Sequence, residues 1–156
     1  MIARLSGTLL DKLPGLAVID VAGVGYEVSI PLSTYYDLGE PGSRVELHIH
    51  THVREDNLAL FGFRTRREKE LFARLIGVGG VGPKTAIAIL SGLGTQDLVE
   101  AVRRRDIGRL SSIPGIGRKT AERIALELAD RLESLEGPSD AGGSAARAPG
   151  AARLRE

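Results

Sequence analysis

Alternating apolar and polar positions along residues 1–63 predict a domain built from β-strands. The clearest alternation runs from residue 45 to residue 54, where side chains divide between the two faces of one strand. One face carries Val45, Leu47, Ile49 and Val53, and the other carries Glu46, His48, His50, His52 and Arg54. Upstream, strand-like segments at 17–21 and 26–30 flank a Gly-Val-Gly turn and predict a hairpin. Several short strands in such a segment suit a small closed barrel of the OB type, although the pattern alone also permits a sandwich.

From Thr65 onward, the spacing of apolar residues becomes that of helices. Residues 65–68, Thr-Arg-Arg-Glu, have the form of a capping box that starts a helix. An apolar stripe follows at helical spacing, formed by Leu71, Phe72, Leu75 and Ile76. The change of periodicity predicts a domain boundary near 63–65, with a β domain at 1–63 and a helical domain at 64–136.

Start signals place the remaining helices of this second domain. Pro83 suits the first turn of one helix, Thr95 is expected to cap a helix at 96–105, and Asp106 is expected to cap a short helix ending before Pro114. The last helix is predicted from residue 118 to about residue 135, with one apolar face formed by Ile124, Leu128, Leu132 and Leu135. Gly, Pro, Ala and Ser then dominate residues 137–156, which are predicted to be a flexible linker or tail.

The most informative pattern is a repeat with a spacing of 35 residues inside the helical domain. Val-Gly-Gly-Val-Gly-Pro-Lys-Thr-Ala at 78–86 recurs as Ile-Pro-Gly-Ile-Gly-Arg-Lys-Thr-Ala at 113–121. A repeat of this length indicates one supersecondary unit used twice. In each copy a Gly-apolar-Gly turn joins two predicted helices. Glycine permits a tight turn and a close approach of backbone to ligand, and the free N–H groups of the next helix favour a phosphate.

Two such turns predict two contacts with a nucleic-acid backbone. The candidate residues are the turns and the side chains that begin the following helices. They are Gly80, Val81, Gly82, Lys84 and Thr85 in the first copy, and Gly115, Ile116, Gly117, Arg118, Lys119, Thr120 and Arg123 in the second. Valine in place of Gly82 or Gly117 is expected to hinder both the turn and the approach to phosphate.

The net charge of +1 conceals a division of charge along the chain. Residues 1–63 carry 4 Lys and Arg against 8 Asp and Glu, a charge of −4, whereas residues 64–131 carry 14 against 8, a charge of +6. Positive charge therefore coincides with the repeat, as expected for contact with nucleic acid. None of the 3 Phe and 3 Tyr lies after Phe72. Because bases cannot stack on aromatic rings there, duplex DNA held through its phosphates is favoured over single strands.

Composition also excludes several classes of protein. Cysteine is absent, which excludes disulfides and thiolate metal ligands, and no apolar run approaches membrane-spanning length. Residues 1–12 lack the long apolar stretch of a signal peptide. We therefore expect a cytoplasmic protein with no membrane partner.

Two segments come close to known nucleotide-binding motifs, but neither has all the features that the motif requires. Residues 77–82 satisfy G-x-G-x-x-G, but the segment before them has a helical pattern, whereas a dinucleotide site follows a strand. Pro83 separates Gly82 from Lys84, which a Walker-type phosphate loop requires to be adjacent. We expect no cofactor and no nucleotide hydrolysis.

Polar clusters in the β domain raise the question of a metal site. His48, His50 and His52 share a strand face, but a zinc site needs a further ligand, so a solvated or interface face is the better interpretation. Glu55 and Asp56 are adjacent. On a strand they would point to opposite faces, and at a turn they would be solvated, so no metal site is predicted.

Taken together, the repeat and three motifs in the β domain resemble the RuvA family. Both copies fit the helix-hairpin-helix pattern, with apolar residues at Leu75, Val78, Ala86, Ile89 and Leu90, and at Leu110, Ile113, Ala121, Ile124 and Ala125. The β domain adds Gly-Val-Gly-Tyr-Glu-Val at 23–28, Val-Arg-Glu-Asp at 53–56 and Leu-Phe-Gly-Phe at 60–63. The resemblance extends from residue 1 to about residue 135. It is more specific than a tandem hairpin alone, which many DNA repair proteins share.

This resemblance implies an α+β protein, an OB-type barrel followed by a tandem helix-hairpin-helix domain. It implies binding of four-way Holliday junctions in recombination, DNA repair and the SOS response. The implied partners are further copies in a homotetramer, a RuvB-type ATPase motor and a RuvC-type junction resolvase. Glu55 and Asp56 match the family's acidic pin, where repulsion of phosphates guides strand separation. The family's motor-binding third domain is expected to be absent, so we expect this chain to bind junctions without recruiting the motor.

Two other functions stay open on the residues alone. A helix-hairpin-helix glycosylase or nuclease needs a nucleophile or carboxylate set beside a base pocket, and no convincing set is present. A generic duplex-binding scaffold would share the hairpins but have no preference for junctions. We therefore expect a non-enzymatic junction-binding subunit, which a comparison of junction with linear duplex would test.

Overall fold

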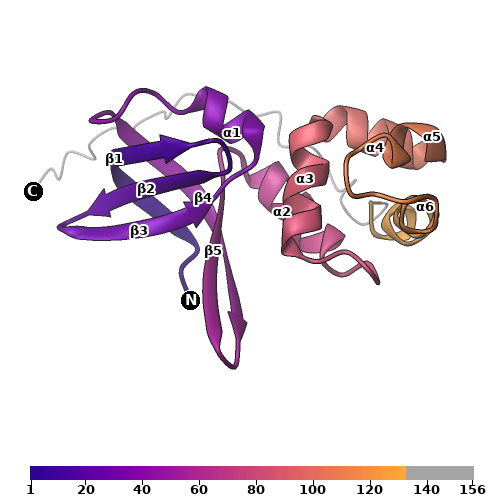
Figure 1. Cartoon of the computed structure of the whole chain (residues 1–156), viewed down its shortest axis with the longest axis horizontal. Helices are drawn as coiled ribbons and strands as arrows, with labels where there is room; N and C mark the ends of the chain where they lie inside the picture. Colours follow the sequence, from indigo (N-terminus) through magenta and orange to yellow (C-terminus); the bar gives the residue numbers. More distant parts are fainter. Residues whose placement is uncertain (133–156) are drawn as a thin grey trace, which may run out of the picture.

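Five strands in the first 63 residues close into a barrel in this computed structural model, which describes residues 1–132 (Figure 1). The strands are β1 (Arg4–Leu13), β2 (Leu16–Val21), β3 (Val24–Ser29), β4 (Arg44–Arg54) and β5 (Asn57–Phe63). Their order is β1-β2-β3-β5-β4, and β4 pairs back onto β1 to close the sheet. The OB-type barrel is therefore confirmed over the sandwich that the pattern also permitted.

Alternation along the strands fills the barrel with apolar side chains, as the sequence pattern predicted. On β4, Val45, Leu47 and Ile49 are all buried in the barrel core. Val53 lies on the same face, as predicted, but it is 62% exposed. The reason is that β4 and β5 continue past the barrel as a two-stranded hairpin, since β3 pairs with β5 only at Phe61.

The β2–β3 hairpin has a shorter turn than the Gly-Val-Gly sequence predicted. Only Ala22 and Gly23 form the loop, with φ of 51° and 91°, while Val24 is already paired with Val21. A two-residue loop with positive φ at both positions matches the twist of the flanking strands. Asp20 supports it, because its Oδ1 accepts a hydrogen bond of 2.9 Å from the Gly23 N–H.

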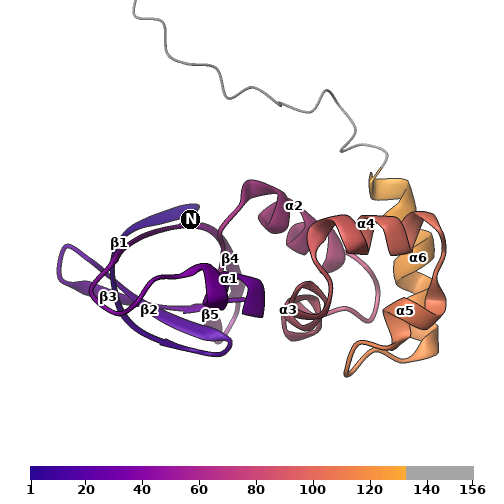
Figure 2. The ribbon, with the colours of Figure 1, turned by 90° about the horizontal axis from the view of Figure 1, so that it is seen from above.

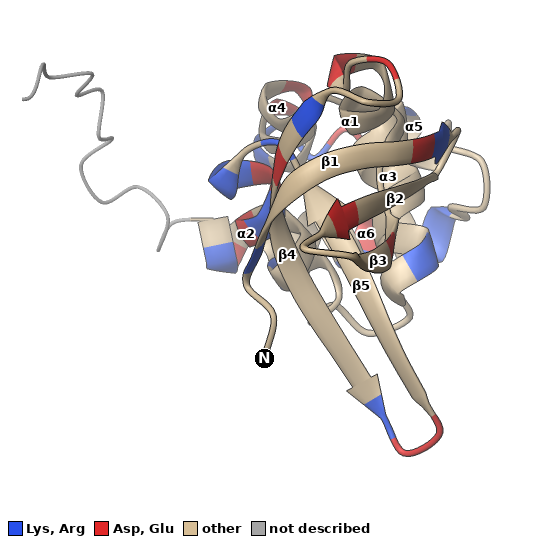
Figure 3. Cartoon of the chain, turned by 90° about the vertical axis from the view of Figure 1, so that its left-hand side faces the viewer, with Lys and Arg blue, Asp and Glu red and all other residues tan. Residues whose placement is uncertain are grey.

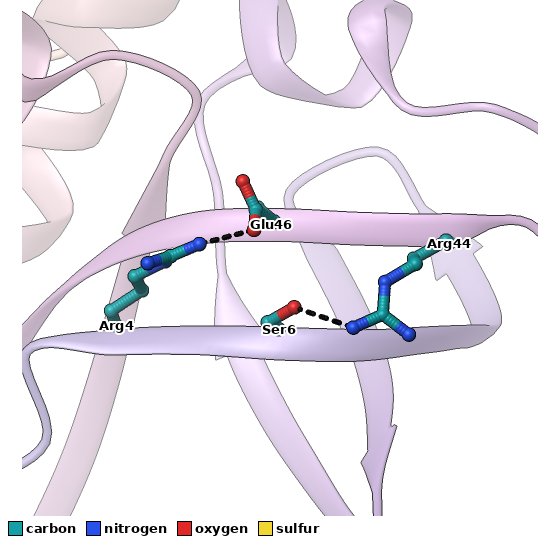
Figure 4. Close-up of polar contacts among 4 residues, drawn as sticks. All are labelled: Arg4, Ser6, Arg44 and Glu46. Atoms are coloured by element: carbon teal, nitrogen blue, oxygen red, sulfur yellow. Dashed lines mark hydrogen bonds and ion pairs between the residues drawn. The ribbon is translucent and has the colours of Figure 1, made fainter. Parts of the chain in front are cut away.

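Polar side chains cover the outer face of β1 and β4 (Figure 4). Arg4 forms an ion pair with Glu46, and Arg44 Nη2 donates to Ser6 Oγ at 3.2 Å, both across the two strands. Arg4 and Glu46 side chains are each 60% exposed, so this pair adds little stability. The contrast with the apolar interior fixes which face of β4 points inward.

Helices make up the rest of the described chain (Figures 1 and 2). They are α1 (Leu32–Asp37), α2 (Arg66–Leu75), α3 (Pro83–Gly92), α4 (Thr95–Arg103), α5 (Ile107–Ser111) and α6 (Arg118–Leu132). The sequence pattern did not predict α1, which is only 6 residues long and connects β3 with β4. The predicted end of the last helix near residue 135 and the predicted linker at 137–156 lie outside the described residues.

Two of the three predicted helix caps are confirmed. Thr65 Oγ1 accepts a hydrogen bond from the Glu68 N–H at 3.2 Å, and Asp106 Oδ1 accepts one from the Arg109 N–H at 3.0 Å. The prediction for Thr95 is wrong, because Gly94 is the N-cap and Thr95 already belongs to α4. Gly94 has extended backbone angles, and its carbonyl accepts the first intrahelical hydrogen bond from Leu98 at 2.9 Å.

The helices pack directly against the barrel. Phe61 and Phe63 from β5 belong to the apolar core of the helical part, and each ring centroid lies 5.0 Å from that of Phe72 in α2. A second contact joins α1 to α3, where the Leu32 N–H donates to Ser91 Oγ at 3.1 Å. Aromatic packing of this kind fixes the barrel and the hairpins relative to each other. Among residues 1–132, no helix has the length and apolar character required to cross a membrane.

Candidate nucleic-acid interface

Both copies of the sequence repeat fold into the same helical hairpin. The first connects α2 with α3 and the second connects α5 with α6. Gly80 and Gly115, which are equivalent in the repeat, have left-handed φ of 83° and 87°. The Val81 N–H donates to the Val78 carbonyl at 3.1 Å, and Ile116 repeats this bond to Ile113 at 3.0 Å. The repeat in sequence is therefore a repeat of backbone geometry.

Apolar residues anchor each turn in the helical core. Val78, Val81, Ile113 and Ile116 are at most 5% exposed. Val81 and Ile116 were predicted contact residues, and the structure leaves only their backbone near the surface. Burying these side chains turns the glycine-rich backbone outward, where Gly80 and the second turn's glycines are exposed.

The second glycine of each turn is not needed for the fold. Gly82 has φ −89° and ψ 176°, and Gly117 is not among the described glycines with positive φ. A Cβ added at either position would meet nothing within 4 Å. The expectation that valine at Gly82 or Gly117 hinders the turn is therefore wrong, since Gly80 and Gly115 supply the left-handed conformation. What Gly82 and Gly117 leave is open space above the start of a helix.

Cationic side chains stand beside this open space in both copies. Lys84 and Lys119 are exposed and occupy the second residue of α3 and of α6. Gly82 carries no side-chain cap, so N–H groups in the first turn of α3 are available to a ligand. Thr85 and Thr120 follow as half-buried residues, and Arg118 forms an ion pair of 3.4 Å with Glu122. Each hairpin thus places a lysine at a helix N-terminus, and the first hairpin also leaves backbone donors without a side-chain cap.

Arg123 was predicted as part of the second copy, but the structure places it at the first. A Cβ on Gly79 would lie 2.5 Å from Arg123 Nη2, so the guanidinium lies directly over the first turn. Arg123 Nε is 3.8 Å from Glu127 Oε1, and Glu127 Oε2 accepts a hydrogen bond from the Gly79 N–H at 3.2 Å. Helix α6 therefore begins at the turn of the second hairpin and also contacts the turn of the first.

Glu55 and Asp56 form the two-residue turn at the end of the β4–β5 hairpin. Arg54 and Asn57 pair across this turn, and both acidic side chains are exposed. In Figure 3 this red tip extends well away from the barrel and from the helices. The sequence predicted this turn correctly, but it did not predict that the hairpin extends beyond the barrel.

The histidine face of β4 packs against α2. The His50 ring is half-buried, with its centroid 5.2 Å from that of Phe72, and His52 stacks on it at 6.4 Å. Burial lowers the pKa of His50, and the neighbouring His52 and Lys69 lower it further. The His50 ring is thus occupied by a contact with α2 inside the chain. No group of three or more His, Cys, Asp or Glu within residues 1–132 is arranged to hold a metal ion.

Comparison with known proteins matches both parts of this architecture. Residues 1–62 match the family model of the RuvA N terminal domain, and residues 72–130 match that of the SAM-like helix-hairpin-helix tandem. A protein of Halorhodospira halophila is 57% identical over 141 residues, which cover 90% of this chain and 69% of that protein. The chain belongs to the RuvA family.

Further RuvA relatives support the same assignment. A protein of Acidobacterium capsulatum is 52% identical over 151 residues, covering 97% of this chain and 76% of the relative. One of Geobacter sulfurreducens is 54% identical over 136 residues, covering 87% and 68%. All three proteins are named Holliday junction branch migration complex subunit RuvA. The family and the fold that the resemblance implied are thus confirmed.

Proposed function

We propose that this RuvA-family chain binds four-way DNA junctions as a non-catalytic subunit of a branch migration complex, in homologous recombination and DNA repair. The repeated hairpin is the observation that supports this best. The same left-handed glycine, buried anchor, open second glycine and exposed lysine occur twice. They lie in a segment of charge +6, and the relatives named above carry the corresponding name.

Each hairpin holds the phosphates of one duplex segment. Backbone N–H groups around Gly80–Gly82 and Gly115–Gly117 donate to phosphate oxygens, which the helix N-termini also attract. Charge and further hydrogen bonds come from the side chains that begin the following helices, namely Lys84, Thr85, Arg118, Lys119 and Thr120. Because Arg123 lies over the first turn, its guanidinium assists the first hairpin rather than the second. The unit that makes these contacts is the helical domain at 64–136, attached to the barrel at 1–63.

The acidic tip acts at the centre of the junction. Glu55 and Asp56 form the end of a hairpin that extends past the barrel, and in Figure 3 this turn projects further than any other part of the β domain. Their repulsion of phosphates keeps the strands apart where the four arms meet. A ring of four subunits would place four such tips around one crossover and give each arm its own subunit.

In this proposal, other proteins supply the energy for branch migration and the cutting of the junction. Directional branch migration needs an energy source, and the hairpins lack a nucleotide-binding loop because Pro83 separates Gly82 from Lys84. A RuvB-type ATPase would drive migration, and a RuvC-type resolvase would cut the junction. The protein itself is then a positioning subunit.

Affinity for a four-way junction, compared with a linear duplex of equal length, tests this function. We expect the junction to bind at least about ten-fold more tightly, and Lys84→Ala with Lys119→Ala to weaken that binding. Arg44→Ala is the matched control, because Arg44 is an exposed cation on the outer face of β4, away from the hairpins. Equal affinity for both DNAs would instead indicate a generic duplex-binding scaffold.

A further inference from the structure

The loop between α2 and α3 carries two glycines that the helical hairpin itself does not require. Gly77 and Gly79 belong to the G-x-G-x-x-G pattern, yet neither is among the described glycines with positive φ. The second copy of the repeat has Ser112 and Pro114 at the equivalent positions and forms the same turn. A side chain at either position is therefore compatible with the hairpin. The two glycines need another explanation, and helix α6 provides it.

Two arginines of α6 occupy the space that these glycines leave. A Cβ on Gly77 would overlap Arg131 Nη1. A Cβ on Gly79 would overlap the guanidinium of Arg123 in the same way. Arg123, Glu127 and Arg131 follow one another at intervals of four residues, so they share one face of the helix. Glu127 lies between the two arginines and accepts the hydrogen bond from the Gly79 N–H. One face of α6 thus lies along this loop (Figure 2).

Arg131 closes the C-terminal end of α2. Its Nη1 donates to the Arg74 carbonyl at 3.2 Å, and its Nη2 donates to the Gly77 carbonyl at 3.1 Å. Arg74 Nη1 donates in return to the Arg131 carbonyl at 2.6 Å. Carbonyl groups at the end of a helix lack partners within the helix and attract a cation. The guanidinium therefore fixes the point at which the chain leaves α2, immediately before the glycine-rich turn.

The second hairpin closes the matching helix end with a residue of its own. The carbonyl of Arg109 corresponds in the repeat to that of Arg74. The hydroxyl of Ser112, which takes the place of Gly77, donates to the Arg109 carbonyl at 2.6 Å. A local hydroxyl thus does at the second copy what a guanidinium from α6 does at the first. The first turn, unlike the second, depends on the far end of α6 for this hydrogen bond.

We propose that Arg131 is a positioning residue for the phosphate site of the first hairpin, and that residue 77 is a glycine because it must admit the Arg131 guanidinium. This inference rests on the proposed function and adds a control of its first site. Backbone donors bind a phosphate only when they point to one place, so a shift of the chain leaving α2 misdirects them. The C-terminal end of α6 then governs the first phosphate site, while the second forms from its own turn.

Junction affinities of two single variants test the positioning role. Arg131→Met keeps an unbranched apolar stem and removes the guanidinium. Gly77→Ala keeps Arg131 but displaces it, because the atom that the new Cβ would overlap is the end of a flexible side chain. We expect each variant to weaken junction binding in anisotropy titrations by about five-fold or more, and the two together to lose no more than the larger single loss. Arg104→Met is the matched control and should change binding by less than about two-fold, because Arg104 also ends a helix but pairs there with Glu100 at 2.8 Å.

A double-mutant cycle separates positioning from a general loss of stability. Lys84 belongs to the first phosphate site and Lys119 to the second. Arg131→Met with Lys84→Ala should weaken binding by at least about three-fold less than the product of the two single effects. Arg131→Met with Lys119→Ala should give the full product, because the second site forms without Arg131. A variant that only unfolded the protein would lower binding by the same factor in both backgrounds.

Each outcome of these experiments decides one point. Parent-like binding of both single variants overturns the positioning role, and so does the full product with both lysine variants. If urea denaturation shows that Arg131→Met does not fold, Gly77→Ala decides alone in the same cycle. A parent protein with no preference for junction over linear duplex, or a Lys84→Ala variant that binds as the parent does, overturns the proposed function, and the positioning role with it. A shortfall with Lys84→Ala only, in a parent that prefers junctions, supports both.

Discussion

At the scale of single residues, the two glycines of each hairpin differ in their physical role. Gly80 and Gly115 have φ above 80°, where any other residue is strained. Gly82 and Gly117 have ordinary backbone conformations and empty space where a side chain would lie. The first pair therefore serves the fold, and the second pair leaves room for a ligand.

Substitutions at these two pairs should separate stability from binding. We expect Gly115→Ala to lower the free energy of unfolding by about 1–2 kcal/mol, because alanine must adopt a left-handed φ. Gly117→Val should change it by less than about 1 kcal/mol but weaken junction binding at least about ten-fold, because the side chain fills the phosphate site. Urea denaturation and fluorescence anisotropy measure the two quantities. If Gly117→Val binds as the parent does, the open space is not a phosphate site.

His50 should make stability depend on pH. Its pKa is lowered from the ordinary histidine value of 6.5, chiefly by burial, so the unfolded chain takes up a proton more readily than the folded chain. The stabilisation is therefore complete above about pH 6.5 and is lost as the pH falls through the lowered pKa. We expect the melting temperature to fall between about pH 7.5 and pH 5.5, and His50→Phe, which keeps the ring contact with Phe72, to reduce that fall. His48→Phe is the matched control, and an equal fall in all three proteins would contradict this account.

At the scale of elements, the β4–β5 hairpin and helix α6 each serve more than one part of the molecule. The hairpin closes the barrel at its base and extends an acidic turn at its end. Helix α6 begins at the second turn and reaches the first through Arg123 and Glu127. The two helical hairpins are thus tied to one helix, which holds them at a constant separation.

Neutralising the tip should reveal its electrostatic role. We expect Glu55→Gln with Asp56→Asn to preserve or tighten junction binding, by less than about ten-fold, because two negative charges near phosphates are removed. In the complete branch migration complex, the same change should alter the rate of strand exchange. Junction titrations and a branch migration assay measure these effects. Substantial loss of binding would show that the carboxylates have a structural role instead.

At the scale of the whole molecule, the distribution of charge matters more than its sum. The acidic barrel and the basic helical part are packed together through Phe61, Phe63 and Phe72. In the proposed function, positive charge would then lie at the duplex arms and negative charge at the crossover. A protein with net charge +1 can bind DNA strongly because its partner meets these regions separately.

Binding should depend on salt and not on sequence. We expect junction affinity to fall by about 100-fold or more between 50 and 200 mM salt, because each hairpin displaces counterions from phosphates. Junctions of the same shape with different arm sequences should bind within about three-fold of one another. Anisotropy titrations at several salt concentrations test both statements. A flat salt response would rule out the electrostatic contact.

The sequence by itself determined the parts of this protein that depend on local spacing. The strand alternation of residues 45–49, the caps at Thr65 and Asp106, and the glycine turns follow from neighbouring residues, because backbone angles and periodicity are local properties. The family followed from the same motifs. The short helix α1 and the Gly94 cap were missed because their signals are weak over few residues.

Only the tertiary structure decided which distant residues share a site. Arg123 lies over the turn at Gly79 because α6 packs back across the first hairpin. Val53 is exposed because the barrel ends before the hairpin does, so within residues 1–132 no strand covers this apolar position. Periodicity tells which face of a strand is apolar, but burial depends on whether another element covers that face, and this is a property of the whole fold.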